Sequence, residues 1–138
     1  MRLVVLDTNV IVSAGNDPRG APAAIVMEGV LEGRVQVVSS PYVAREYVEV
    51  TRRARSLRYR FPPAWLEFLL AESLALDDPP PWPRACPDPD DAPFLALAAV
   101  SGAWLVTGNL KHFPRAARGK VSVVSPADYL AHLRASEA

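Results

Sequence analysis

The sequence predicts an α/β fold with three layers, in which helices cover both faces of a central parallel sheet. Short, continuously apolar runs of strand length alternate along the chain with segments of helical periodicity. Strands buried on both faces are unbroken apolar runs, and their alternation with helices is typical of a parallel sheet. Half of the 138 residues are hydrophobic and no internal repeat is present, so we expect a single domain over residues 1–138.

The first part of the chain is expected to form two strands and three helices. A turn rich in glycine, proline and asparagine precedes the first helix. Ser40 and Pro41 supply an N-cap and a first-turn proline for the second helix, and Pro62-Pro63 opens the third. The expected elements are a strand over residues 3–6, a helix over 23–31, a strand over 35–38, and helices over 41–55 and 64–74.

The second part begins with an irregular stretch, residues 77–93, that is rich in proline and aspartate. We expect a loop there rather than a linker, because too little regular structure flanks it to fold alone. Asp77 and Asp78 are expected in an ordinary turn, and Asp90 or Asp91 is expected to cap the next helix. The expected elements are a helix over 93–101, strands over 104–107 and 121–124, and a helix over 127–133.

Composition limits the classes of function. The 15 basic residues balance the 15 acidic ones, so binding of nucleic acid requires a local basic patch rather than an overall positive field. Cys86 is the only cysteine, which excludes an internal disulfide and a cysteine-rich zinc site. The sequence has neither a signal-peptide pattern nor an apolar run long enough to span a membrane, and we therefore expect a cytoplasmic protein.

Asp7 directly follows the first apolar run. In open α/β sheets the functional groups lie just beyond the carboxyl ends of the strands, which makes an acid at this position a candidate metal ligand. Thr8 and Asn9 follow in the same turn and offer further oxygen atoms for coordination or hydrogen bonding. The alternative is that Asp7 serves only as a turn or cap residue.

Glu46 is expected on the inward face of the helix over residues 41–55. Val43, Tyr47 and Val50 form an apolar stripe at helical spacing, and Glu46 lies among them. A carboxylate that faces inward needs a cation or hydrogen-bond donors. That cation is either a metal shared with the acid after the first strand, which we favour, or an arginine in an internal salt bridge.

Three further aspartates, Asp88, Asp90 and Asp91, precede the helix over residues 93–101. One of them is enough to cap that helix. Three at one helix start are more than capping requires, and a bound divalent cation would offset their mutual repulsion. We therefore predict Asp88 and Asp91 as metal ligands.

Asn109 follows the strand over residues 104–107, where a fourth ligand is expected. Its amide oxygen can coordinate a cation or orient water but adds no negative charge; the alternative is a turn asparagine beside Gly108. Hard oxygen ligands without cysteine or histidine indicate Mg²⁺ or Mn²⁺, which can activate water for attack on a phosphodiester. The predicted catalytic residues are Asp7, Glu46, Asp88, Asp91 and Asn109, with the four acids as metal ligands.

A dense basic run near the end of the helix over residues 41–55 is the candidate surface for substrate. Such a run can hold phosphates and stack bases; the alternative is a solvated helix end whose arginines favour the helix dipole. His112 is expected to be a surface or cap residue, and the tryptophans are expected in the core or at an interface. The run comprises Arg52, Arg53, Arg55, Arg58 and Arg60 with Tyr59 and Phe61, and the weaker substrate-binding candidates are Thr8, Asn9, Thr107, Lys111, Arg52 and Arg53.

These segments resemble the PIN domain family, and most closely the toxin nucleases of toxin–antitoxin pairs, the VapC type and its relatives. The resemblance covers nearly the whole chain. It rests on the order and spacing of four segments: LVVLDTNV at residues 3–10, Glu46 in its helix, DPDDAPFLALA at 88–98 and LVTGN at 105–109.

The resemblance implies a three-layer α/β/α fold and metal-dependent cleavage of RNA. It also implies a homodimer and, for toxin members, an antitoxin protein encoded alongside. The family's first three acids match Asp7, Glu46 and Asp91. Its fourth acid is replaced by Asn109, so the number of metals stays open, although Asp88 can compensate for the missing charge.

Two other functions stay open. A phosphatase with an aspartate nucleophile also has an aspartate after its first strand, but it needs a second one two residues later, where this chain has Asn9. A degenerate PIN-like module that binds RNA or protein without cleavage is favoured by Asn109 and opposed by the presence of Asp7 and Glu46. Cleavage assays with and without EDTA separate a nuclease from a binding module.

Overall fold

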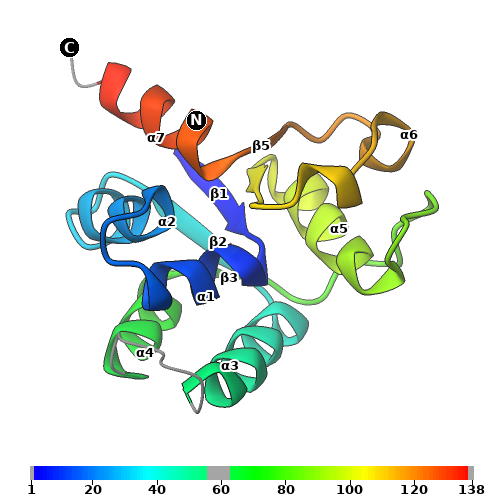
Figure 1. Ribbon diagram of the computed structural model, residues 1–138. Coiled ribbons are helices and arrows are strands. Elements are labelled where there is room, and N and C mark those ends of the chain that lie inside the picture. Colours follow the sequence, from blue (N-terminus) through cyan, green and yellow to red (C-terminus); the bar gives the residue numbers. More distant parts are fainter. Residues whose placement is uncertain (1, 56–62, 137–138) are drawn as a thin grey trace.

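A computed structural model describes residues 2–55 and 63–136 of the chain. Five parallel strands form one sheet in the order β3-β2-β1-β4-β5, and helices cover both of its faces (Figure 1). The predicted three-layer α/β/α fold is therefore confirmed. The strands are β1 (Leu3–Leu6), β2 (Gln36–Ser39), β3 (Leu74–Ala75), β4 (Trp104–Val106) and β5 (Val123–Val124).

Within the described residues, seven α-helices and three short helices of other types connect the strands. Helix α5 packs on β1, β2 and β4, and Figure 1 shows α1 and α2 on the other side of the sheet. The α-helices are α1 (Thr8–Asn16), α2 (Ala21–Ala24), α3 (Pro41–Arg55), α4 (Pro63–Glu72), α5 (Ala92–Ser101), α6 (Arg115–Arg118) and α7 (Pro126–Ala135); the short ones are the π-helix η1 (Ile25–Val30) and the 3₁₀-helices η2 (Pro89–Asp91) and η3 (Leu110–His112).

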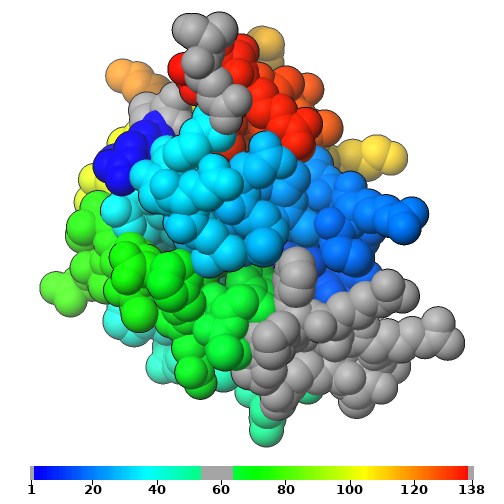
Figure 2. Space-filling model, turned by 90° about the vertical axis from the view of Figure 1, so that its left-hand side faces the viewer, coloured from blue at the N-terminus to red at the C-terminus, as the bar shows by residue number. Residues whose placement is uncertain are grey.

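The face of the molecule away from α5 is built from α2, η1, α4 and α7. Figure 2 shows α7 packed above the α2–η1 segment, with α4 below it. An ion pair between Arg134 of α7 and Glu28 of η1, 2.7 Å between Nη2 and Oε2, ties the last helix to this layer. Because this pair is partly exposed, we expect the apolar contacts beneath it to contribute more stability than the charges.

The central strand β1 positions the candidate site. Its side chains Val4, Val5 and Leu6 are fully buried, which explains the unbroken apolar run. The carboxyl ends of β1 and β4 meet, since the backbone N–H of Asp7 donates to the carbonyl of Val106 at 2.9 Å. The strand order reverses at β1, which has β2 on one side and β4 on the other, and ligands of open α/β sheets bind at such a point.

The main difference from the predicted elements is α1, which begins directly after β1. The sequence indicated only a polar turn there, yet Val10, Ile11 and Ala14 are buried at helical spacing. The periodic stretch is short and its first residues are polar, so its pattern resembles a loop. The two-residue β3 and the four-residue α6 were not predicted either, because segments of that length carry no readable period.

Smaller corrections concern the segment around β3. The predicted helix over residues 64–74 ends at Glu72, and Leu74 pairs with Val38 of β2 instead. Asp78 is more than a turn residue, because its Oδ1 accepts the backbone N–H of Tyr42 at 3.0 Å and so caps α3. Within the residues that the structure describes, no helix has the length and apolar character needed to cross a membrane.

Tyr47 of α3 links the helix layer to the strand that carries Asp7. Its side chain is fully buried and its hydroxyl donates to the backbone carbonyl of Leu6; burial raises the pKa of the phenol. In Tyr47→Phe the carbonyl loses this donor, so we expect the free energy of unfolding to fall by about 1–2 kcal/mol. Urea unfolding measures this, and an unchanged midpoint would show that the bond contributes nothing to stability.

Candidate metal centre

Asp7 is a buried carboxylate held at the end of β1. Only 6% of the surface of Asp7 is exposed. Oδ1 accepts the backbone N–H of Thr8 at 2.8 Å, so Asp7 is also the N-cap of α1. Oδ2 accepts the hydroxyl of Thr107 at 2.8 Å. Burial is the main reason that the pKa of Asp7 is raised, although these two hydrogen bonds oppose the rise.

Asn9 and Thr107 join the ends of β1 and β4 around this carboxylate. The Asn9 side chain accepts the backbone N–H of Gly108 at 3.0 Å and donates to Oδ2 of Asp7 at 3.3 Å. The Thr107 hydroxyl accepts the backbone N–H of Asn109 at 3.0 Å. Both side chains are therefore engaged in holding the acid and the loop after β4. Nothing in this geometry tests whether these two side chains, or Thr8, also contact a substrate, so that role stays a prediction.

Asp88, Asp91 and His112 form a group of potential metal ligands. One donor atom from each lies within 4.8 Å of the other two. Nδ1 of His112 is 3.1 Å from Oδ2 of Asp91, and the Asp91 side chain is only 14% exposed. The loop before α5 supplies the two acids, and η3 after β4 supplies the imidazole. Segments on either side of β4 in the chain thus meet at one point.

The charges of this group extend to Asp7. The pKa of Asp91 is raised to about 6, first by burial and then by the negative charges of Asp7 and Asp88, while His112 opposes the rise. Asp88 likewise raises the pKa of Asp7. Three carboxylates thus repel one another in a partly buried place, with one imidazole nearby to offset them. Bringing a cation among them would relieve this repulsion.

The donor set suits a divalent cation. Carboxylate oxygens are ligands for Mg²⁺ and Mn²⁺, and an imidazole nitrogen is compatible with Mn²⁺ and with softer transition metals. The sequence indicated an oxygen-only set because His112 was assigned to the surface or to a helix cap. His112 does lie partly exposed, but its ring nitrogen is beside Asp91, which adds an imidazole to the potential donors. The donor group is therefore Asp88, Asp91 and His112, and Asp7 is a charged neighbour that raises the pKa of Asp91.

Glu46 lies at the margin of the buried stripe of α3 rather than within it. Val43 and Tyr47 are fully buried, whereas Glu46 is only half-buried and accepts the hydroxyl of Tyr42 at 3.3 Å. That phenol packs edge-on against Phe94 of α5. The pKa of Tyr42 is raised by burial and then by Glu46, Asp90 and Asp88, which places Glu46 near the acidic group. Its predicted role as a ligand stays a prediction.

The roles of the three clustered aspartates differ from the predicted capping. Asp88 is the cap, because its Oδ1 accepts the backbone N–H of Asp90 at 3.0 Å at the start of η2. Asp91 occupies the N-cap position of α5 but makes no capping hydrogen bond with its side chain. Its carboxylate is directed to His112 instead. Asn109 begins η3, and its predicted catalytic role stays untested by this geometry.

The predicted basic surface is only partly within the described residues. Arg52 pairs with Glu49 at 2.8 Å on the exposed side of α3, and Arg53 is also exposed. The side chain of Arg55 and all of residues 56–62, which include the remaining members, lie outside the described part. Lys111 is exposed next to His112 in η3, so this predicted substrate contact lies beside a potential metal ligand.

The raised pKa of Asp91 predicts how stability depends on pH. Between its ordinary pKa of 3.8 and about 6, the folded protein binds a proton that the unfolded chain has released. The stability of the metal-free protein should therefore fall as pH rises through this window, by about 1–2 kcal/mol after solvent screening. Urea unfolding across that range should show the loss in wild type and less of it in Asp91→Asn. A larger loss in Asp91→Asn would contradict this assignment.

Comparison with known proteins places these residues in a family. The model of the PIN domain matches residues 3–111, a span that includes all four predicted acids and Asn109 but ends before His112. A search of the curated proteins found no match. PIN domains are generally metal-dependent nucleases, and the acidic group described above fits that chemistry. The chain therefore belongs to the PIN domain family.

Proposed function

We propose that this protein is a ribonuclease that hydrolyses phosphodiesters with a divalent cation, Mg²⁺ or Mn²⁺. The observation that carries the proposal is the meeting of Asp88, Asp91 and His112 beyond the carboxyl ends of the strands, with Asp7 close enough for its negative charge to raise the pKa of Asp91. Such a site binds cations because their charge offsets the repulsion. The family match supports a nuclease in general.

The four side chains have separate tasks in this proposal. When bound, a divalent cation acts as a Lewis acid, makes water more acidic and offsets the charge that develops on the phosphodiester. Asp7 supplies a fixed carboxylate, since Thr8 and Thr107 hold its two oxygens. Asp91 and His112 supply two further donors, 3.1 Å apart. Glu46 extends the acidic surface beside Tyr42.

The biological setting that we propose is a toxin–antitoxin pair. The support is the likeness of the motifs to toxin nucleases of this family. In this setting the protein acts on RNA, forms a homodimer and is held inactive by an antitoxin protein. Co-expression with a protein encoded by the neighbouring gene should relieve growth inhibition by wild type, whereas Asp7→Asn should not inhibit growth at all.

A second candidate function is binding of RNA or protein without cleavage. Asn109, a neutral side chain at the position of the family's fourth acid, favours it. The two functions differ in one assay. Purified protein, stripped of metal with EDTA, is incubated with end-labelled single-stranded RNA and with DNA of the same sequence, with Mg²⁺, Mn²⁺ or neither. A ribonuclease shortens the RNA only when metal is added. RNA that stays uncleaved under every condition would exclude the nuclease and favour the binding module.

A further inference from the structure

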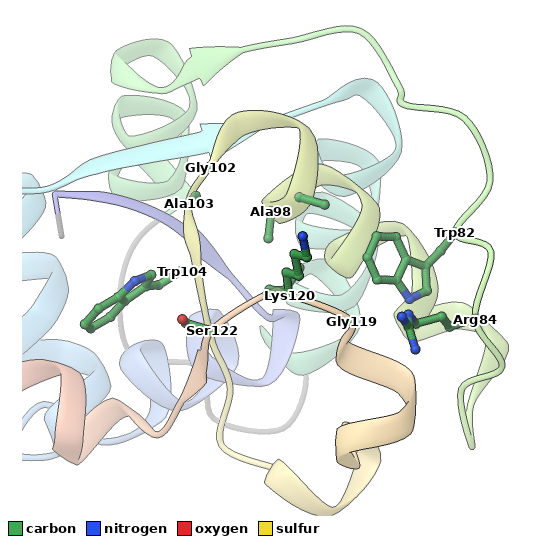
Figure 3. A pocket seen from close by; sticks show the side chains of 11 residues that line it. Trp82, Arg84, Ala98, Gly102, Ala103, Trp104, Gly119, Lys120 and Ser122 are labelled. Atoms are coloured by element: carbon green, nitrogen blue, oxygen red, sulfur yellow. The ribbon is translucent and has the colours of Figure 1, made fainter.

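A cavity lies away from the metal centre, at the amino-terminal ends of β4 and β5. It has a volume of about 520 Å³, within the range of pockets that hold small ligands. Trp82 and Arg84 line it from the loop before η2, and Trp104 and Lys120 line it from the starts of the two strands (Figure 3). β4 runs from this cavity toward the metal centre, so the two sites lie at opposite ends of this strand.

The side chains that line this cavity combine cations with aromatic rings. Among the described residues, Arg84 and Lys120 are the charged ones that line it, and none of the lining residues is a carboxylate. The ion pairs found among the described residues involve neither of them. In the view of Figure 3, Lys120 lies beside the indole ring of Trp82, whereas the indole of Trp104 points away from both and packs on Tyr129 and His132 of α7. An anionic ligand with a flat ring therefore complements the cavity in both charge and shape.

The positions of these groups are fixed by the fold. The indole N–H of Trp82 donates to the carbonyl of Ala117 at 2.7 Å, and His132 packs on Trp104 with 4.8 Å between ring centroids. Gly119 lies beside them with a positive φ of 58°, and a Cβ there would lie 2.9 Å from Nε of Arg84. Glycine at this position therefore lets the guanidinium lie close to the backbone.

A basic segment connects the metal centre to the cavity. Residues 110–120, here called the basic crossover, leave the carboxyl end of β4 and return to the amino end of β5. They carry Lys111, Arg115, Arg118 and Lys120, and no acid occurs between residues 92 and 127. In a chain of zero formal charge, this concentrates positive charge along one path. The family match ends at Lys111, so most of the crossover lies outside it.

We propose that this cavity binds one nucleotide of a single-stranded RNA whose chain follows the basic crossover away from the metal centre. The base lies against Trp82, and the adjoining phosphates contact Arg84 and Lys120. Stacking on aromatic rings beside cations is how single strands are held without sequence preference. The proposal rests on RNA being the substrate, and it gives the enzyme a preference for strands long enough to span both sites.

The test compares strand length in proteins with and without the cations of the cavity. Three metal-free proteins are titrated in EDTA with a labelled trinucleotide and with a longer single strand. They are wild type, the cavity variant Arg84→Gln/Lys120→Gln, and the charge-matched control Arg19→Gln/Arg45→Gln. The cavity variant should bind the longer strand about tenfold more weakly, with a salt slope reduced by about 1.4 units for the two cations removed. Its affinity for the trinucleotide should equal that of the control. All substituted arginines and the lysine are exposed, and urea unfolding verifies the fold.

Tryptophan fluorescence measures separately whether a base stacks on Trp82. The longer strand should quench wild type more than Trp82→Phe, whereas free uridine monophosphate should quench neither appreciably at the same concentration. Equal binding of the long strand by cavity variant and control would overturn the proposal. Binding of the free nucleotide as tight as that of the strand would also overturn it and indicate a nucleotide pocket. If binding depends on strand length but added Mn²⁺ gives no cleavage, the proposed nuclease activity is wrong, whereas the proposed RNA binding in the cavity is supported.

Discussion

Asp7→Asn should abolish tight binding of Mn²⁺ and lower RNA cleavage by about 100-fold or more. The substitution keeps the shape of a side chain that is buried at the end of β1, but it removes the charge that attracts the cation. A metal ion lowers the barrier of phosphodiester hydrolysis by several kcal/mol, and each loss of about 1.4 kcal/mol costs tenfold in rate. Calorimetric titration with Mn²⁺ and single-turnover cleavage measure the two effects.

A matched control separates this effect from a general change of charge. Asp77→Asn removes one negative charge from an exposed position in the loop after β3. This variant should bind Mn²⁺ and cleave RNA as wild type does. Because burial raises the pKa of Asp7, the asparagine variant should also be at least as stable as wild type without metal. Equal Mn²⁺ affinity in Asp7→Asn and wild type would show that Asp7 is not a ligand.

His112→Gln should weaken Mn²⁺ binding by at least about tenfold, since even the loss of groups that only support a ligand costs that much in metal sites. Mg²⁺, which prefers oxygen, should be affected less. The ratio of Mn²⁺ to Mg²⁺ affinity is therefore the quantity to compare. It reports the imidazole itself, because a general loss of structure would weaken both cations equally.

The only other histidine provides the control for this variant. His132 lies in α7, where it packs on Trp104 and not on the acids. His132→Gln should leave the ratio of the two affinities unchanged. If His112→Gln also leaves it unchanged, the nitrogen beside Asp91 does not bind the metal, and the cation is held by carboxylates alone.

The sequence predicts the layers of this fold well because burial determines the pattern of its central strands. β1 and β4 are covered on both faces, so their residues form unbroken apolar runs. It predicts the edges less well. β3 has only Leu74 and Ala75, and both are exposed, so neither length nor hydrophobicity distinguishes this strand from the loop that follows.

The candidate acids could also be found from the sequence, because each lies at a strand end or a helix start. His112 could not, since its partner Asp91 lies 21 residues away and is brought to it only because the chain reverses at Gly102 and α5 packs back on β4. Its sole local signal was its position three residues after Asn109. Glu46 shows the opposite limit: helical spacing placed it within the buried stripe, whereas it is only half-buried and accepts the hydroxyl of Tyr42.

Metal binding and cleavage, followed in the same titration, test the central claim most directly. EDTA-treated protein is titrated with Mn²⁺ while calorimetry records occupancy and a labelled RNA records the rate of cleavage. A metal-dependent nuclease built on Asp7, Asp91 and His112 predicts no cleavage at the start and a rate that rises in parallel with occupancy. Cleavage that proceeds in EDTA, or full occupancy without any cleavage of RNA, would contradict it.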